Sequence, residues 1–429
     1  MLNARSMRTA ATLALLTAFT ASCGNLDANS SGGTSSGKAG TLTIGFVSPQ
    51  TGSLAGFGEA DQFVVGQMNE HFAKNPLTVG GKTYAVKIVV KDAQSDSKRA
   101  GEVAAELINT DNVDLIIAEG TPDIVNPVAD QCEANATPCV TTVAPWQPYF
   151  LGRGGTKEKP FAWTYHFFWG LEDVAATYQD MWSQIPSNKK VSGLFPNDPD
   201  GQAWSKAFPD MVKANGYSID APGLYTNGSQ DFSAQISAFK GKGDDIITGV
   251  PIPPDFTNFW KQAKQQGLNP KLATIGKALL FPSSVEALGD LANNLGTEVW
   301  WTPTYPYKSS LTGQSAADLA AAYEQKTGKQ WTQPLGFAEA LFEVSAAAVV
   351  KAGGTDKKSV AGALKSLKGS TVVGDLDWTS GPVPNVAKTP LTGGQWRKTT
   401  GGKYPYDLVI VSNKLAPNIP TGGKVQPLR

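Results

Sequence analysis

Histidine and cysteine are scarce in this chain of 429 residues, which holds two histidines and three cysteines. His71 and His166 do not have the spacing of metal ligands, and neither lies beside a Gly-x-Ser-x-Gly turn. The sequence therefore favours neither a zinc site nor a serine hydrolase. Carboxylate pairs such as Asp198 and Asp200 occur, but acids at strand ends commonly cap helices. We expect no metal, no cofactor and no catalysis.

An excess of charge of either sign is also missing, because Lys+Arg and Asp+Glu each number 37. This balance argues against nucleic acid or an anionic membrane surface as the main partner. Beyond the N-terminal segment, no stretch approaches the ~18 consecutive apolar residues that a membrane-spanning helix needs. The composition, 41% hydrophobic and 17% charged residues, is that of an ordinary globular protein.

The N-terminus has the pattern of a secretory signal. Arg5 and Arg8 precede a short apolar run, residues 10–19, and small residues follow it. Cys23, directly after Ala-Ser, resembles the lipid-carrying cysteine of bacterial lipoproteins. We predict a signal peptide at 1–22, lipidation of Cys23, a flexible Gly/Ser-rich tether at 23–40, and an extracytoplasmic protein held at the cell membrane by its lipid alone. The alternative is a plain secreted protein with an incidental cysteine.

The two remaining cysteines, Cys132 and Cys139, lie seven positions apart. Outside the cytoplasm two nearby thiols usually pair, so we predict a disulfide between them. A redox or metal pair is the weaker alternative because the spacing is not Cys-x-x-Cys.

Short apolar runs alternate with segments of helical period, which predicts an α/β fold with mostly parallel sheets. A length of 429 residues favours two domains. Strands are predicted at 42–47, 84–90, 114–118, 139–143, 190–195, 218–222, 245–249, 271–275, 298–301, 371–377 and 406–411. Helices are predicted at 59–73, 98–109, 123–135, 171–184, 202–215, 231–239, 255–266, 316–327, 337–351 and 358–367.

These elements form two βα series followed by a helical return. We predict a first lobe of residues 41–163 plus 302–370 and a second lobe of 164–301 plus 371–429. Ligands of open α/β sheets bind beyond the carboxyl ends of the strands, so the cleft between the lobes is the expected site.

Four segments resemble type I periplasmic binding proteins of the leucine/isoleucine/valine branch, which serve ABC transporters. They are TLTIGFVSPQTGSLAGFGEADQFVVGQMNE, KDAQSDSKRAGEVAAELI, DLIIAEGTPDIVNPVADQCEANATPCVTTVA and DIITGVPIPPDFTNFWKQAKQQGL. The resemblance spans residues 41–412. It implies two α/β lobes joined by three crossovers, closing on a small ligand that is handed to a membrane permease.

Four candidate ligand contacts lie in the first lobe. The resemblance places Phe57, an aromatic residue before a glycine, at the ligand wall; an ordinary strand-to-helix turn is the alternative. Thr121 follows a strand and could bind a carboxylate or cap the next helix. Ala144 and Trp146 stand where the family often has a Ser/Thr-rich turn, and Trp146 replaces a hydroxyl with an aromatic surface.

Five candidates lie near the lobe crossings or in the second lobe. We expect most of the aromatic block 161–169 to be core, with Phe168 and Trp169 facing the cleft. Trp301 lies near a later crossing, and Pro251 belongs to a rigid loop at a strand end. Asp198 could hold a cationic group or cap a helix.

Lys277 stands where amino-acid binders of the family carry an acid for the ligand's amine. A lysine there, if it points inward, favours a carboxylate over a zwitterion's ammonium; a solvated lysine is the alternative. The sequence thus predicts a monomeric solute-binding lipoprotein of an ABC importer that takes an amino acid, amide or carboxylate, including aromatic ones. A ligand sensor that signals to a receptor is the alternative, and an extracytoplasmic hydrolase a remote one.

Overall fold

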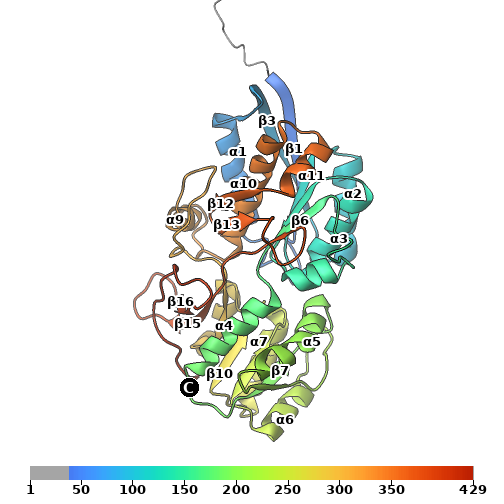
Figure 1. The fold of residues 1–429 in the computed structure, drawn as a ribbon. Coiled ribbons are helices and arrows are strands. Elements are labelled where there is room, and N and C mark those ends of the chain that lie inside the picture. Colours follow the sequence, from blue (N-terminus) through green and yellow to red (C-terminus); the bar gives the residue numbers. More distant parts are fainter. Residues whose placement is uncertain (1–37, 429) are drawn as a thin grey trace, which may run out of the picture. The chain divides into compact units, whose positions relative to one another are not determined.

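Two seven-stranded sheets organise residues 38–428, the part of the chain that the computed structural model describes (Figure 1). The predicted signal peptide and Cys23 lie outside these residues, as does the predicted tether as far as residue 37. The first strand, β1, begins at Lys38, so the last three residues assigned to the tether belong to it.

The first sheet has the order β14-β6-β5-β4-β1-β3-β2, and all its neighbours are parallel except β2, which is antiparallel to β3. Its strands are β1 (Lys38–Ser48), β2 (Leu77–Val79), β3 (Lys82–Asp92), β4 (Leu115–Glu119), β5 (Cys139–Thr142), β6 (Thr164–Phe167) and β14 (Val386–Ala387). Every residue of β4 is buried, as expected of a parallel strand covered on both faces.

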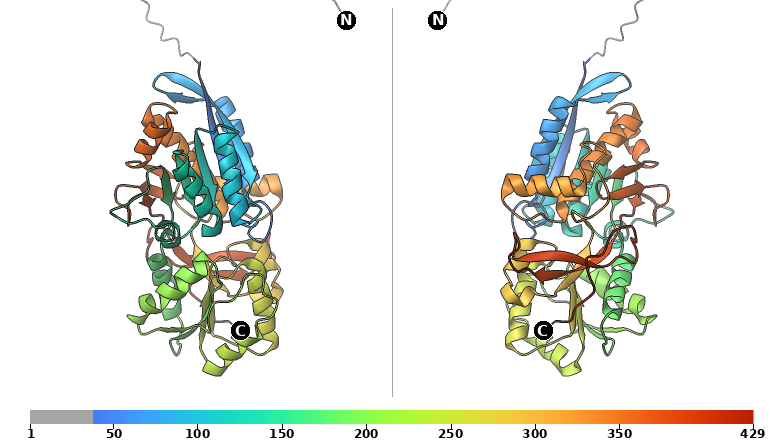
Figure 2. Two further views of the ribbon diagram at one scale, coloured as in Figure 1. Left: turned by 90° about the vertical axis from the view of Figure 1, so that its right-hand side faces the viewer. Right: turned by 90° about the vertical axis from the view of Figure 1, so that its left-hand side faces the viewer.

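Helices cover both faces of this sheet. They are α1 (Asp61–Lys74), α2 (Ser97–Asn109), α3 (Pro122–Ala134), α9 (Ala316–Thr327), α10 (Pro334–Ala352) and α11 (Lys357–Leu364). In Figure 1, α1 and α10 lie on one side of the strands and α2 and α3 on the other. Figure 2 shows the late helices, in orange, beside the first strands, in blue, and α10 packs against α1 and β2. The helices between residues 316 and 364 therefore complete the first lobe.

The second sheet has the order β16-β15-β11-β10-β9-β7-β8. Its strands are β7 (Lys190–Leu194), β8 (Ser218–Asp220), β9 (Ile246–Gly249), β10 (Leu272–Ile275), β11 (Gly296–Val299), β15 (Thr392–Lys398) and β16 (Tyr406–Ser412). The first five are parallel, and β15 and β16 add an antiparallel edge. Its helices are α4 (Leu171–Ser183), α5 (Pro199–Lys213), α6 (Ser233–Lys242), α7 (Pro253–Gln265) and the short α8 (Pro282–Glu286).

The chain crosses between the sheets three times, after β6, after β11 and after β14. The two-lobe α/β fold with three crossovers is thus confirmed, but two predicted lobe boundaries are misplaced. β6 begins at residue 164, assigned to the second lobe, yet pairs with β5 of the first sheet. The hairpin of β12 (Lys368–Thr371) and β13 (Gly374–Asp377) starts before the predicted boundary at 371, and β14 after it pairs with β6. The sheet assignments therefore move the first crossing past 167 and the third past 387.

The predicted disulfide is not formed in the structure, where Cys132 in α3 and Cys139 at the start of β5 are free, buried thiols. The two thiols are nevertheless close together, since the Cys132 side chain is hydrogen-bonded to Cys139. This bond and burial raise the pKa of the Cys132 thiol. A disulfide requires a sulfur separation of about 2.05 Å, whereas here both side chains pack as small apolar groups between helix and sheet.

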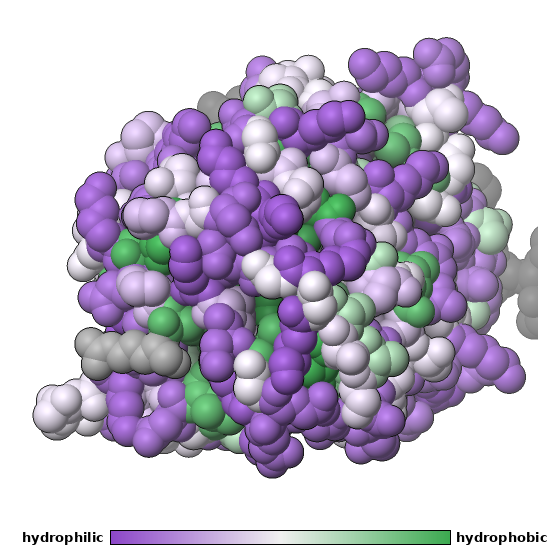
Figure 3. Space-filling view, turned by 90° about the horizontal axis from the view of Figure 1, so that it is seen from below, coloured by the Kyte–Doolittle hydropathy of each residue, from purple (hydrophilic) through white to green (hydrophobic). Residues whose placement is uncertain are grey.

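The face of the molecule seen from below is mostly hydrophilic (Figure 3). In the view of Figure 3, hydrophobic side chains form scattered spots among hydrophilic ones. Among residues 38–428, no helix is both long and apolar enough to cross a membrane.

Candidate ligand-binding site

A cavity lies where the carboxyl ends of the two parallel sheets meet. The first lobe contributes loops that follow β1, β4 and β5, and the second contributes residues that follow β7, β9 and β10; two crossings supply the rest. The lining residues are Phe57, Thr121, Val143, Pro145, Phe168, Trp169, Asp200, Trp204, Val250, Lys277, Leu280, Glu298 and Trp300. This is the position where open α/β sheets bind ligands.

The space inside is small, with a volume of about 20 Å³. A single water molecule needs about 10–15 Å³ on the same measure, and small-molecule sites are usually far larger. The lobes must therefore part, or side chains must shift, before an organic molecule can enter.

Aromatic rings make up much of the wall. Phe168 lies with its ring centre 4.6 Å from that of Trp169 and 5.3 Å from that of Trp300. The lining residue Phe57 packs edge-on against Phe281, at 4.9 Å between centres. Such walls suit an apolar or planar ligand body.

Two lining residues have left-handed backbone conformations that side chains disfavour. Val143, after β5, has a φ of 70°, and Lys277, after β10, has a φ of 59°. For a β-branched residue such as Val143 this is a clear outlier, and strain of this kind clusters at binding sites. The strain supports a functional role for this end of the sheets.

Lys277 points inward and is held by two carboxylates. Its ammonium lies 3.0 Å from Asp198 Oδ2 and 2.9 Å from Asp200 Oδ2, and all three side chains are at most 5% exposed. Asp198 also caps α5 by accepting a hydrogen bond from the Gly201 N–H at 2.8 Å, and Asn227 Nδ2 donates to it at 3.0 Å. Both interpretations of Asp198, helix cap and partner of a cation, are therefore present, and the cation is the protein's own lysine.

Burial and the mutual charges of these groups together set the ionisation of this cluster. Burial raises the pKa of Asp200 to about 6, against the lowering effect of Lys277 and with a further rise from Asp198. Burial acts in the same sense on Asp198, but Lys277 and the Gly201 N–H hold its pKa below the usual range. Burial would lower the pKa of Lys277, whereas Asp198 and Asp200 keep it above normal. The lysine is thus fully charged and more than neutralised by its neighbours.

Glu298 adds a further buried acid to the cavity wall. It accepts hydrogen bonds from the Tyr178 hydroxyl and, at 3.3 Å, from the Lys277 N–H. Burial raises the pKa of its carboxyl. The second lobe therefore presents more carboxylates than cations to the cavity.

Five polar atoms that line this cavity have no hydrogen-bond partner although they are buried. They are Thr121 Oγ1, Trp169 Nε1, Asp200 Oδ1, Trp204 Nε1 and Trp300 Nε1. Buried polar atoms in native proteins are normally paired, so each of these needs a partner that the closed fold does not supply.

Half of the predicted ligand contacts line the cavity, namely Phe57, Thr121, Phe168, Trp169 and Lys277. Thr121 occupies the N-cap position of α3 without capping it through its side chain. The solvated alternative for Lys277 is wrong, and so is the idea that its charge stands free to attract a carboxylate.

The other five predicted contacts lie outside the lining. Trp146 donates its indole N–H to Glu172 at 3.1 Å, and Trp301 donates to the Val372 carbonyl at 3.2 Å, so both turn away. Ala144 accepts a hydrogen bond from His166 Nε2 at 2.8 Å. Pro251 is buried next to the lining residue Val250, and Asp198 reaches the cavity only through Lys277.

Sequence reasoning missed three lining residues with strong chemistry, Trp204, Glu298 and Trp300. Trp204 lies one helical turn after Asp200 on α5, which places both on one face. Glu298 is an acid within a strand whose residues are all buried. The helical spacing of Trp204 and the position of Glu298 at the start of a predicted strand were readable in the sequence, whereas nothing in it separates Trp300 from its neighbour Trp301.

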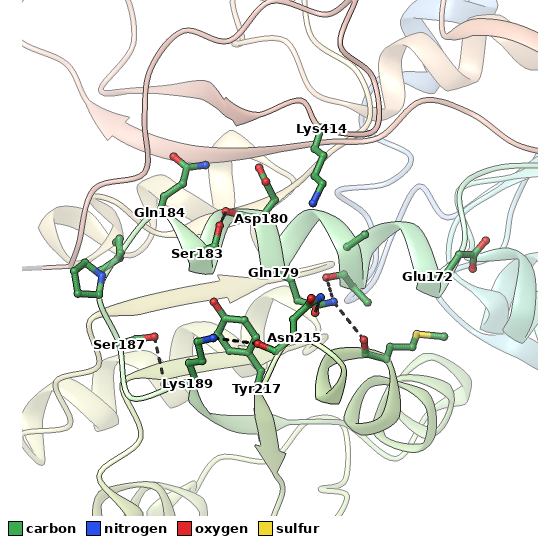
Figure 4. Close-up of a pocket in the computed structure, with 15 residues that line it drawn as sticks. Glu172, Gln179, Asp180, Ser183, Gln184, Ser187, Lys189, Asn215, Tyr217 and Lys414 are labelled. Carbon is green, nitrogen blue, oxygen red and sulfur yellow. Dashed lines mark hydrogen bonds between the residues drawn. The ribbon is translucent and has the colours of Figure 1, made fainter.

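A larger groove of about 880 Å³ lies on the second lobe between α4 and α5, with residues such as Gln179, Lys189, Asn215 and Tyr217 along it (Figure 4). Asn215 Nδ2 donates to Gln179 Oε1 at 2.6 Å, and Lys189 Nζ donates to the Asn215 carbonyl at 3.1 Å. Lys189 and Tyr217 come just before β7 and β8, so the groove lies at the amino ends of these strands. It is not where α/β sheets bind ligands.

Among residues 38–428, no group of His, Cys, Asp and Glu could hold a metal ion. His166 is stacked on Tyr149 at 4.1 Å between ring centres, and burial lowers its pKa to about 3. It is a neutral core residue.

Two open α/β sheets joined by three crossings, with a cavity at their carboxyl ends, are the architecture of a two-lobed binding protein. The chain belongs to the periplasmic binding protein family, whose model matches residues 41–402.

Individual relatives agree with this assignment. The Leu/Ile/Val-binding protein homolog 3 of Brucella melitensis is 25% identical over 351 residues, which cover 79% of this chain and 87% of the relative. The crystal structure of the leucine-binding protein LivK from Thermotoga maritima has a TM-score of 0.72 at 20% identity, covering 87% of this chain and 99% of that one. A solute-binding protein of an ABC transporter from Rhodopseudomonas palustris, in complex with 3,4-dihydroxybenzoic acid, has a TM-score of 0.70 at 19% identity, covering 88% and 99%.

Proposed function

We propose that the protein is the extracytoplasmic solute-binding lipoprotein of an ABC importer. It captures a small organic solute, an amino acid, amide or carboxylate, between its lobes and delivers it to a permease. The N-terminal signal pattern with Cys23 supports a lipid anchor, and the family membership supports a location outside the cytoplasm.

The observation that carries this proposal is the cavity enclosed by side chains from both lobes. A ligand that contacts both sides at once binds the closed state more tightly than the open one, and this difference drives closure. The lining contains unpartnered polar atoms and aromatic walls but no nucleophile paired with a base, which fits capture without chemistry.

Binding can be tested on the full-length protein by differential scanning calorimetry against a panel of amino acids, amides, and aliphatic and aromatic carboxylates. A compound present at one hundred times its Kd should stabilise the protein by about 2.7 kcal/mol. Small-angle scattering with the same compound should show a smaller radius of gyration. A panel without any stabilising compound, together with native mass spectra free of co-purified small molecules, would contradict the proposal.

Transport can be separated from sensing in the bacterium itself. If the protein serves an importer, deleting its gene should abolish high-affinity uptake of the compound identified above. Unchanged uptake with loss of a transcriptional or chemotactic response would point to sensing instead.

A further inference from the structure

The unpartnered atoms of the cavity are mostly hydrogen-bond donors. The indole N–H groups of Trp169, Trp204 and Trp300 can only donate, and Asp200 Oδ1 is the one carboxylate oxygen among the five atoms. Each buried donor left without an acceptor weakens binding by roughly a factor of five or more. A fitting ligand must therefore bring several acceptor oxygens to this wall.

The position for a ligand ammonium is already occupied. Lys277 places its own ammonium between Asp198 and Asp200, at 3.0 and 2.9 Å. A second ammonium could reach the free oxygen of Asp200, beside the like charge of Lys277, or the Glu298 carboxyl, which already accepts from the Tyr178 hydroxyl and the Lys277 N–H. In either position it would leave the indole donors unsatisfied. The cavity is thus poorly built for a cationic headgroup.

We propose, on the basis of the proposed function, that the solute is a monocarboxylate without an ammonium group and with an apolar or aromatic body. A carboxylate offers about four acceptor sites, enough for the three indole N–H groups and the Thr121 hydroxyl. The rings of Phe57, Phe168 and Trp300 then cover the body of the ligand. The internal ammonium of Lys277 takes the place that the headgroup of an amino acid would need.

The charges around the cavity imply that the protein takes up a proton when it binds such an acid. Asp200 is faced by Lys277, by Asp198 and by Asp123 of α3; Glu298 of β11 lines the same cavity, and Asp255 of α7 lies near Asp198. These carboxylates outnumber the one lysine, so an anionic ligand is accommodated when Asp200 takes up a proton. The pKa of Asp200 is about 6 in the ligand-free protein. Protonating it at pH 7 therefore lowers the affinity for the acid by about tenfold. This loss is smaller than the loss of affinity from several indole N–H groups without an acceptor.

The experiment compares matched pairs that differ only in the ammonium group. Isothermal titration of the full-length protein would use phenylalanine against 3-phenylpropanoate, and leucine against 4-methylpentanoate. We expect the acid of at least one pair to bind ten times or more tighter than its amino acid. Tighter binding of the amino acid in both pairs would overturn the inference and leave the proposed function intact, whereas no binding of any panel compound would remove the proposed function itself.

Proton uptake gives a second readout. Above pH 6 the Kd of the preferred acid should rise by up to tenfold per pH unit, and titrations in buffers of different ionisation enthalpy should show about one proton bound per ligand. In Asp200→Asn this pH dependence should disappear. Binding of the acid without proton uptake, or weakened by acidification, would contradict the role of Asp200.

The indole donors are tested by Trp204→Phe and Trp300→Phe, which keep an aromatic ring and remove the N–H. Each should weaken binding of the acid by roughly fivefold or more. The matched control is Trp260→Phe, because the Trp260 N–H donates to the Leu291 carbonyl at 2.9 Å, outside the cavity. Thermal unfolding of each ligand-free variant separates lost binding from lost folding. Equal affinities in all three variants would overturn the role of the donors.

Discussion

Glu119 and Asp61 form a buried pair of acids in the first lobe. Glu119 ends β4, two residues before Thr121, and Asp61 begins α1, where the Ser48 hydroxyl donates to it. Burial raises the pKa of Asp61 to about 6, and burial together with the charge of Asp61 raises the pKa of Glu119 well above its usual range. The folded protein therefore keeps a proton on this pair at a pH where the unfolded chain has lost it.

The sign of the pH effect follows from the raised pKa values. The pair stabilises the fold most at pH values below about 4, and this contribution is lost as the pH rises through 6 and above. Glu119→Gln replaces the protonated acid with a neutral group of the same shape. We expect the variant to match the wild type within about 0.5 kcal/mol at pH 4.5 and to gain about 1–2 kcal/mol on it at pH 8.

Urea unfolding at the two pH values checks this expectation. The control is Glu102→Gln on α2, where the side chain is 49% exposed and pairs with Lys98 and Arg99 on the surface. Its effect should stay within about 1 kcal/mol at both pH values. An unfolding free energy of Glu119→Gln that is lower than wild type at pH 8 would show that the pair is ionised and stabilising.

Single residues also show the limit of sequence reasoning. The sequence leaves open whether Lys277, at the position where the resemblance implies an acid in amino-acid binders, faces inward or solvent, and the structure shows that it faces inward. The sequence does not predict that Asp198 and Asp200, some 80 positions earlier, converge on the same ammonium. Partnerships of this kind depend on how two strand ends are placed in space, which periodicity does not encode.

Asn385 stabilises the position of β14, the short strand that precedes the third crossing. It precedes β14, has a φ of 67°, and exchanges two hydrogen bonds with Phe161: the Phe161 N–H donates to Oδ1 at 3.1 Å and Nδ2 donates to the Phe161 carbonyl at 2.9 Å. Its own carbonyl accepts from the His166 N–H at 2.8 Å. The short β14 is thereby held against β6.

Asn385→Ala should destabilise the protein by about 2–3 kcal/mol, because two partly buried backbone groups of Phe161 lose their partners and alanine disfavours a positive φ. Asn112→Ala is the matched control: Asn112 has a φ of 53°, but it is exposed and bonds only locally, to the Thr110 carbonyl at 3.0 Å. Its cost should stay near 1 kcal/mol. If both variants lose the same free energy of unfolding in chemical denaturation, the two hydrogen bonds to Phe161 contribute nothing beyond the backbone conformation.

At the scale of elements, the sequence predicts long periodic segments well and short ones poorly. The helix predicted at 316–327 matches α9, and each of the other nine predicted helices overlaps an observed one. The strands β2, β6, β14 and β15 were not predicted. β6 lies within a block of aromatic residues without alternation, β14 has two residues, and β15 begins with Thr-Gly-Gly; none of these carries the period of a strand. The misplaced lobe boundaries follow from these omissions.

For the whole molecule, the two lobes touch each other beside the cavity residue Phe57. Gly56 lies in the loop after β1, and the ring of Phe281 comes from the second lobe, just before α8. A Cβ atom on Gly56 would lie 2.8–3.0 Å from three atoms of that ring, closer than real contacts allow. Phe57 packs edge-on against the same ring. Closure thus requires that position 56 carry no side chain.

Gly56→Ala should keep the lobes from closing fully, because the added methyl group would collide with the Phe281 ring. Its φ is not in the left-handed region, so the loop itself tolerates alanine and the fold should remain intact. We expect the Kd of the tightest-binding panel compound to rise about tenfold, equivalent to about 1.4 kcal/mol of lost closure, and the radius of gyration of the ligand-bound protein to increase. The control is Gly66→Ala on α1, where a Cβ atom meets nothing within 4 Å. Titration and small-angle scattering on both variants decide the matter, since a Gly56→Ala protein that binds and closes like the control would show that the lobes come together without this contact.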